Sequence, residues 1–144
     1  MDFTLRQVIG VILWWTEGTK SYKDKRWENT WSYTVDLTNT NVDIIKLFLE
    51  FLRKDIGVDE QRLKLQLQIH EGDNQAKLET YWSRVTQIPL QRFTKTTIRP
   101  KGKKVGKSMG TCKVRYSDKP TYMKIHFLLH KILESHSAIA ENGV

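Results

Sequence analysis

Apolar residues lie on nearly every side of the segment 8–15, within the stretch TLRQVIGVILWWTE at residues 4–17. This density predicts a helix that is buried on more than one face, at the centre of a fold or in a subunit interface. Thr4 is the expected N-cap of the helix, and Gly18 directly after Glu17 is a stop signal.

Three further helices follow from one-sided apolar patterns. The first begins at Thr40 or Asn41 and ends at Gly57. A short helix opens at residues 73–74, runs through 82–85 and stops before Pro89. The last begins at Asp118 with Pro120 in its first turn. We expect one domain over residues 1–135 and a flexible tail over 136–144.

Strict alternation of apolar and polar residues predicts a strand over 63–70. The segment 20–38 is predicted to form a hairpin with its turn at 28–30, and two more strands are expected near 92–99 and 111–116. This order of elements favours an α+β fold, with an antiparallel sheet whose helices cover one face.

The outer face of that sheet is expected to carry long amide and cationic side chains. On the strand 63–70 these are Lys64, Gln66, Gln68 and His70. Lys113 and Arg115 point together, opposite Cys112 and Val114. Lysine and arginine suit guanine edges and glutamine suits adenine edges in a DNA major groove. A plain solvated sheet face has the same pattern and is the alternative.

The positions of the basic residues along the chain indicate a polyanionic partner. The 144 residues carry 24 Lys+Arg and 16 Asp+Glu, a net charge of +8. Residues 92–115 contain nine basic residues and no acid, so the rest of the chain stands at −1; a smaller cluster, 20–26, has four bases and one acid. The candidate nucleic-acid contacts are therefore Lys20, Lys23, Lys25, Arg26, Lys64, Gln66, Gln68, His70, Lys95, Arg99, Lys101, Lys103, Lys104, Lys107, Lys113 and Arg115.

The sequence lacks the features expected of a membrane protein, a disulfide-bonded protein or a complete zinc site. No apolar run approaches about 18 residues and no basic segment opens the chain, so we expect a cytoplasmic protein without a membrane partner. The single Cys112 excludes an internal disulfide and is expected to be a small buried side chain. His126 and His130 have the four-residue spacing of a zinc pair, but without a third ligand we expect ordinary helix surface.

Glu17 is the acid that stands out, because it ends an almost wholly apolar helix. The negative end of the helix dipole disfavours a bare carboxylate, which hints at a cation nearby, and a carboxylate can ligate Mg²⁺. An ordinary surface glutamate at a helix end is the alternative.

The segment Gly10-Val-Ile-Leu-Trp-Trp-Thr-Glu-Gly18 resembles the LAGLIDADG motif, with an apolar helix, a small residue and a closing acid–glycine pair. The strand and helix that follow, the basic strands and the closing helix resemble the family's αββαββα unit, so the resemblance covers most of the chain. The sequence departs from the motif at Ile12 and Trp15, and the helix near 74–86 is an addition to the unit.

The resemblance implies a DNA-binding protein that forms a homodimer through helix 4–17. LAGLIDADG proteins include endonucleases that cut phosphodiester bonds, in which the last acid of the motif binds a divalent metal; here this would be Glu17 with Mg²⁺. They also include regulators that bind DNA without cutting it. We therefore expect double-stranded DNA as the partner and leave cleavage open. The alternatives are a non-catalytic module that binds DNA or RNA, and a protein-interaction domain that uses its Trp-rich first helix and hairpin.

Overall fold

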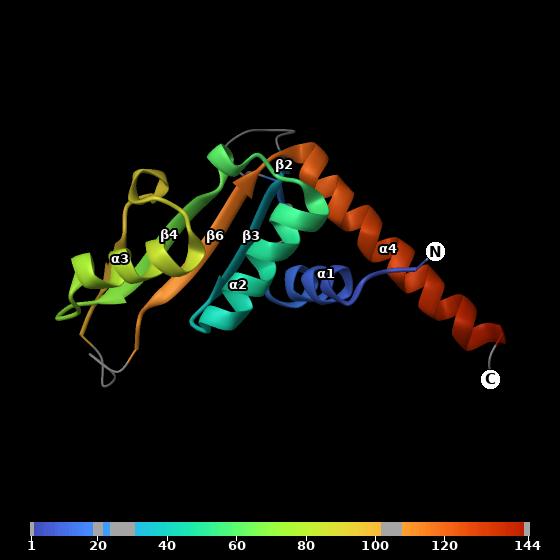
Figure 1. The fold of residues 1–144 in the computed structure, drawn as a ribbon, viewed down its shortest axis with the longest axis horizontal. Helices are drawn as coiled ribbons and strands as arrows, with labels where there is room; N and C mark the ends of the chain where they lie inside the picture. The colour runs from blue at the N-terminus through green and yellow to red at the C-terminus, as the bar shows by residue number, and fades with distance from the viewer. Residues whose placement is uncertain (1, 19–21, 24–30, 102–107, 143–144) are drawn as a thin grey trace.

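The chain adopts an α+β fold in a computed structural model that describes residues 2–18, 22–23, 31–101 and 108–142 (Figure 1). Only the backbone is described for residues 22–23, 31–32 and 137–142. Within this part of the chain, four α-helices accompany a four-stranded sheet and a separate two-stranded pair.

The four-stranded sheet is mixed, whereas the sequence led us to expect an antiparallel one. Its strands, in spatial order, are β3 (Thr34–Asn39), β6 (Thr111–Ser117), β4 (Lys64–His70) and β5 (Thr97–Arg99). β6 pairs antiparallel with both β3 and β4, but β5 runs parallel to β4. The parallel pair arises because the chain crosses over through a helix between β4 and β5 and returns in the same direction.

The expected strand at 92–99 is wrong for most of its length. Leu90–Arg92 form a 3₁₀ turn after Pro89, and only Thr97–Arg99 become a strand. Phe93 makes one isolated bridge to Leu65, and the side chain of Arg92 is directed to a carboxylate on another turn. β5 is therefore a short, exposed edge strand.

The expected hairpin at 20–38 is present in part. β1 (Tyr22–Lys23) pairs antiparallel with β2 (Trp31–Ser32), while β3 belongs to the larger sheet. The expected turn at 28–30 lies outside the described residues.

The helices begin where the sequence predicted. They are α1 (Leu5–Glu17), α2 (Val42–Phe51) with a π-helical extension (Leu52–Ile56), α3 (Gln75–Thr86) and α4 (Lys119–Asn142). Thr4 forms a capping box with Gln7, and Asn41 and Asn74 cap α2 and α3. Gly57 has a φ of +77° at the end of the α2 extension, which its lack of a side chain permits. Residues 136–142, expected to form a tail, continue α4.

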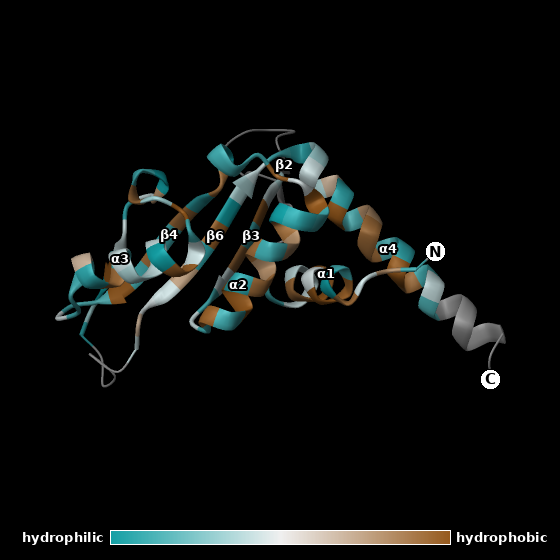
Figure 2. Cartoon of the chain, viewed as in Figure 1, coloured by the Kyte–Doolittle hydropathy of each residue, from teal (hydrophilic) through white to brown (hydrophobic). Residues whose placement is uncertain are grey.

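Figure 1 shows α1, α2 and α3 on one side of the sheet, with α4 extending away from it. Alternate residues of the strands point into this helical layer, so hydrophilic and hydrophobic positions alternate along the strand ribbons in Figure 2. Leu65, Leu67 and Ile69 of β4 are fully buried beside Cys112 and Val114 of β6. The core therefore fixes which face of the sheet is left for polar side chains.

One side of α1 packs tightly in the core, and its other side is exposed. Gly10 lies so close to the ring of Phe51 that a Cβ there would be 2.0 Å from its Cγ. Trp14 is buried, whereas Leu5, Ile12 and Trp15 are 75%, 38% and 44% exposed. The prediction of burial on more than one face is thus wrong for a single chain.

Candidate nucleic-acid interface

The side of the sheet opposite the helices carries polar side chains, and we call it the polar face. Its β3 part is covered at Asp36, which is only 5% exposed. The polar face comprises the outward residues of the four strands: Thr34, Asp36 and Thr38; Thr111, Lys113, Arg115 and Ser117; Lys64, Gln66, Gln68 and His70; Thr97 and Arg99. Strand register joins these residues into cross-strand rows, such as Thr38, Lys113 and Gln66, because directly paired residues share a face. The predicted outward direction of the β4 and β6 residues is confirmed.

The polar face is positively charged. It carries four bases (Lys64, Arg99, Lys113 and Arg115) and one acid, Asp36. Lys113 Nζ lies 3.9 Å from Asp36 Oδ2. The other three bases form no ion pair within the described residues, so their charges are available to an external anion.

A hollow of about 320 Å³ opens beside one end of this face. It is lined by Gln61, Arg62, Lys64, Thr94, Arg115 and Ser117. Arg62 is held in place because one amino group donates to Asp118 Oδ1 at 3.2 Å and the other to the Ser117 carbonyl. Its guanidinium also lies over the Tyr116 ring, 5.3 Å from the centroid. Three cationic side chains and two hydroxyls thus surround a space in which a phosphate oxygen could be bound.

The two glutamines of β4 differ in their freedom. Gln66 Nε2 donates to the Lys95 carbonyl at 3.3 Å and to Thr97 Oγ1 at 3.4 Å, which ties its side chain to the β5 edge. Gln68 has no side-chain hydrogen bond to the described part of the chain. Its amide can therefore turn toward a base edge without breaking an internal contact.

The remaining predicted contacts fall into two groups. Arg99 is exposed on β5 within the polar face, and the exposed Lys95 and Lys101 beside β5 extend its positive charge past the edge. The other group lies outside the described residues or, for Lys23, has only its backbone described: Lys20, Lys23, Lys25, Arg26, Lys103, Lys104 and Lys107.

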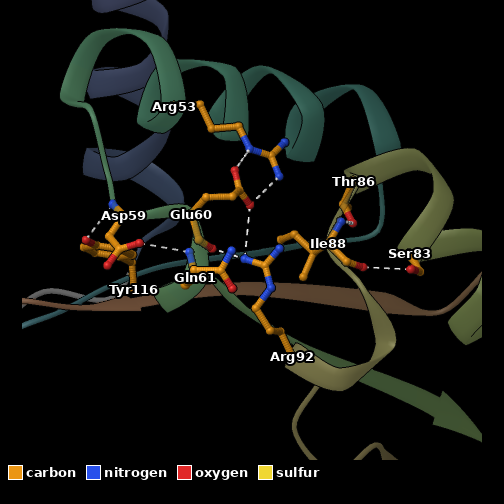
Figure 3. Close-up of polar contacts among 9 residues, drawn as sticks. All are labelled: Arg53, Asp59, Glu60, Gln61, Ser83, Thr86, Ile88, Arg92 and Tyr116. Carbon is orange, nitrogen blue, oxygen red and sulfur yellow. Dashed lines mark hydrogen bonds and ion pairs between the residues drawn. The ribbon is translucent and has the colours of Figure 1, made fainter.

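Arg92 belongs to a structural ion-pair network with Arg53 and Glu60 (Figure 3). It lies in the 3₁₀ turn Leu90–Arg92 and is not one of the strand residues that make up the polar face. Glu60 accepts two hydrogen bonds from Arg53, at 2.6 and 3.1 Å, and its Oε2 lies 3.2 Å from Arg92 NH1. Arg92 also donates to the Glu60 carbonyl, and its side chain is only 13% exposed. One of the nine clustered bases therefore serves the fold.

Glu17 is exposed at the C-terminal end of α1, where this helix meets the sheet. The following Gly18 lies against β3, and a Cβ there would be 2.7 Å from the Asp36 carbonyl oxygen. Among the residues that the structure describes, no three His, Cys, Asp or Glu side chains group as metal ligands. One exposed carboxylate supplies too few oxygens to hold Mg²⁺ by itself.

Arg62 and Thr94 line the hollow beside the polar face, but they were not identified from the sequence as candidate contacts. Arg62 ends the 3₁₀ turn Glu60–Arg62 just before β4, and Thr94 lies in the segment that leads to β5, so neither belongs to an alternating pattern. Cys112, by contrast, is buried as predicted, and burial raises the pKa of its thiol, which keeps it in the unreactive protonated form.

Comparison with known proteins adds no assignment. No family model matches the chain, and neither a curated protein nor a solved structure matches it. No helix in the described ranges is both long and apolar enough to cross a membrane.

Proposed function

We propose that the protein binds double-stranded DNA through the polar face. The observation that carries the proposal is the arrangement of Lys64, Lys113 and Arg115 on adjoining strands with a single neighbouring acid, Asp36. Phosphate groups are the partner that such a surface suits, because each neutralised phosphate releases condensed counterions. Gln66 and Gln68 lie among these bases and supply amides for base edges.

The dimensions of the sheet favour duplex DNA over duplex RNA. Side chains on one face of a strand recur at about 6.6–6.8 Å. This is roughly two steps of the about 3.4 Å rise of B-DNA. The wide major groove of B-DNA admits two adjoining strands, here β4 and β6, whereas the major groove of A-form RNA is deep and narrow. The row Lys64, Gln66, Gln68 and His70 can therefore follow base pairs along a DNA groove.

Salt-dependent binding to a labelled duplex tests the proposal. The Lys113→Gln/Arg115→Gln variant should bind roughly fivefold more weakly for each base removed, and its salt slope should fall by about one unit per base. Lys46→Gln removes an exposed base from α2 on the helical side and should leave binding unchanged. Equal losses in both variants would reject the polar face as the contact surface.

The exposed side of α1 supports a homodimer as the DNA-binding form. Leu5, Ile12 and Trp15 form one apolar stripe that the single chain leaves open. A second copy packed against this stripe would bury it and bring two polar faces together on one duplex. Ile12→Glu should convert a dimer into a monomer in size-exclusion chromatography with light scattering. Leu47→Glu, at a comparably exposed position on α2, is the control; a monomeric wild-type protein would contradict the dimer.

Metal-dependent phosphodiester cleavage at Glu17 is the second candidate function. The close approach of Gly18 to β3 favours it, because this contact brings the end of α1 to the sheet. With one carboxylate per chain, the other ligands of Mg²⁺ would come from DNA phosphates, water or the Glu17 of a second copy. Glu17→Gln should abolish Mg²⁺-dependent cleavage and leave duplex affinity unchanged. A wild-type protein that binds but does not cut would remove this function and leave DNA binding intact.

A further inference from the structure

A pair of histidines lies on α4, away from the polar face. His126 and His130 are one helical turn apart, and their Nε2 atoms are separated by 3.1 Å. The ring centroids are 4.6 Å apart and the rings are inclined by 72°. The two imidazoles therefore approach each other through their Nε2 atoms, which lie closer together than the ring centroids do.

This separation is the one that two imidazoles need to bind the same metal ion. Metal–nitrogen bonds of about 2.0–2.1 Å reach both Nε2 atoms when the angle at the metal is roughly 100°. That angle falls between the about 90° of square-planar sites, typical of Cu²⁺ and Ni²⁺, and the about 109° of tetrahedral zinc sites. The separation of the two Nε2 atoms therefore already matches that of a two-imidazole chelate.

The ring of His126 is held in place by aromatic neighbours. It stacks on Tyr122 at an interplanar angle of 11°, and it meets Trp14 edge-on at 87°. Trp14 is buried against Tyr122 in turn, so this end of the pair is anchored to the core. His130 is exposed, which leaves the paired nitrogens open to solvent. One donor is thus preorganised and the other is accessible.

We propose that His126 and His130 form a two-imidazole site for a divalent transition-metal ion of the group Cu²⁺, Ni²⁺ and Zn²⁺. Imidazole suits these ions, whereas Mg²⁺ prefers oxygen ligands. Within the described residues no third His, Cys, Asp or Glu completes a cluster, so water or an external ligand fills the remaining positions. The site uses neither Glu17 nor any residue of the polar face, so it does not depend on the proposed function.

In the metal-free protein the same pair is joined by a hydrogen bond between the two ring nitrogens. Metal binding replaces that hydrogen bond: the ring that donated from Nε2 changes tautomer and carries its proton on Nδ1, so that both neutral imidazoles present an unprotonated Nε2 to the ion. A structural hydrogen bond alone would give the same metal-free geometry but no chelation. Metal titration separates these two roles.

The experiment is a titration of the whole protein with Cu²⁺, followed by imidazole NMR signals and by calorimetry. The chain has four histidines, so His70 and His136 serve as internal references. Paramagnetic broadening should appear first at His126 and His130, with a stoichiometry of one ion per chain. Equal broadening of all four signals would overturn the proposal.

His130→Asn is the decisive variant, because the side chain is exposed and its loss leaves the core packing of His126 intact. It should weaken Cu²⁺ and Ni²⁺ binding by about tenfold or more, since linked donors raise each other's effective concentration. His136→Asn removes an exposed imidazole from the same helix and should bind like the wild type. Unchanged affinity in His130→Asn, with its thermal unfolding also unchanged, would exclude the site.

Discussion

Arg115 and Lys64 stand directly opposite each other on β6 and β4, two outward-facing cations on adjoining strands. Like charges in this position destabilise a sheet by repulsion. Lys113 is on the same face. The one acid among these residues, Asp36, pairs with Arg115 across β3 and β6 and lies 3.9 Å from Lys113, so Lys64 has no acid beside it in this set. A surface that concentrates repelling charges is expected where an anionic partner relieves the repulsion.

Replacing one member of this pair should therefore improve stability at the expense of binding. Lys64→Gln should raise the free energy of unfolding by about 0.2–1 kcal/mol at low salt, because the cross-strand repulsion is lost. The same variant should bind duplex DNA roughly fivefold more weakly. Urea unfolding and fluorescence anisotropy measure the two effects. A less stable variant with full DNA affinity would show that Lys64 serves the fold.

Glu60→Gln tests the ion-pair network in which Glu60 binds Arg92 and Arg53. The substitution leaves the Arg92 guanidinium, whose side chain is 13% exposed, without its charged partner. Because Glu60 is 41% exposed, solvent screens part of the loss, and we expect destabilisation of about 1–2 kcal/mol. DNA affinity of the folded protein should not change. Glu71→Gln, on the exposed turn after β4, is the control and should unfold like the wild type.

Gly10→Ala tests the contact that seats α1 on α2. The added Cβ would lie 2.0–2.5 Å from atoms of the Phe51 ring, which must move or be strained. We expect destabilisation of about 1–3 kcal/mol in thermal or urea unfolding. Phe51→Leu in the same chain should recover part of the loss by making room. An additive, larger loss in the double variant would contradict this packing.

Asp118 should make stability depend on pH in the acid range. Hydrogen bonds from the Thr121 hydroxyl and backbone, together with Arg62, hold the pKa of Asp118 below its usual value. Its carboxylate therefore contributes stability above the unfolded pKa of about 3.9, and this contribution is lost as pH falls through the lower folded value. Asp118→Asn keeps a capping side chain but removes the charge. The difference in free energy of unfolding between the wild type and this variant should therefore shrink as pH falls below about 4. A difference independent of pH would contradict the charge effect.

The sequence predicted local structure well where one signal dominated. Asn41, Asn74 and Gly57 mark helix ends because capping and left-handed backbone are decided by a few neighbouring atoms. β4 followed from its alternation, since one face of this strand is buried and a one-residue slip would bury lysine and glutamine. The polar face could be anticipated on the same ground.

Long-range pairings were not accessible from the sequence. The ion pair of Arg92 with Glu60 joins positions 32 residues apart, and no local pattern in the predicted strand 92–99 indicates it. The parallel pairing of β5 depends on where the crossover returns the chain, which no local pattern states. The exposure of Ile12 and Trp15 likewise depends on which side of α1 faces Phe51.

The most direct test of DNA binding by the polar face is an NMR titration of the ¹⁵N-labelled protein with duplex DNA. The side-chain amide signals of Gln66 and Gln68, and the backbone signals of Lys113 and Arg115, should shift together and return to their free positions at high salt. Signals of the exposed α2 residue Lys46 should remain in place. Shifts that cluster on α2 and α3, with β4 and β6 unperturbed, would contradict the account.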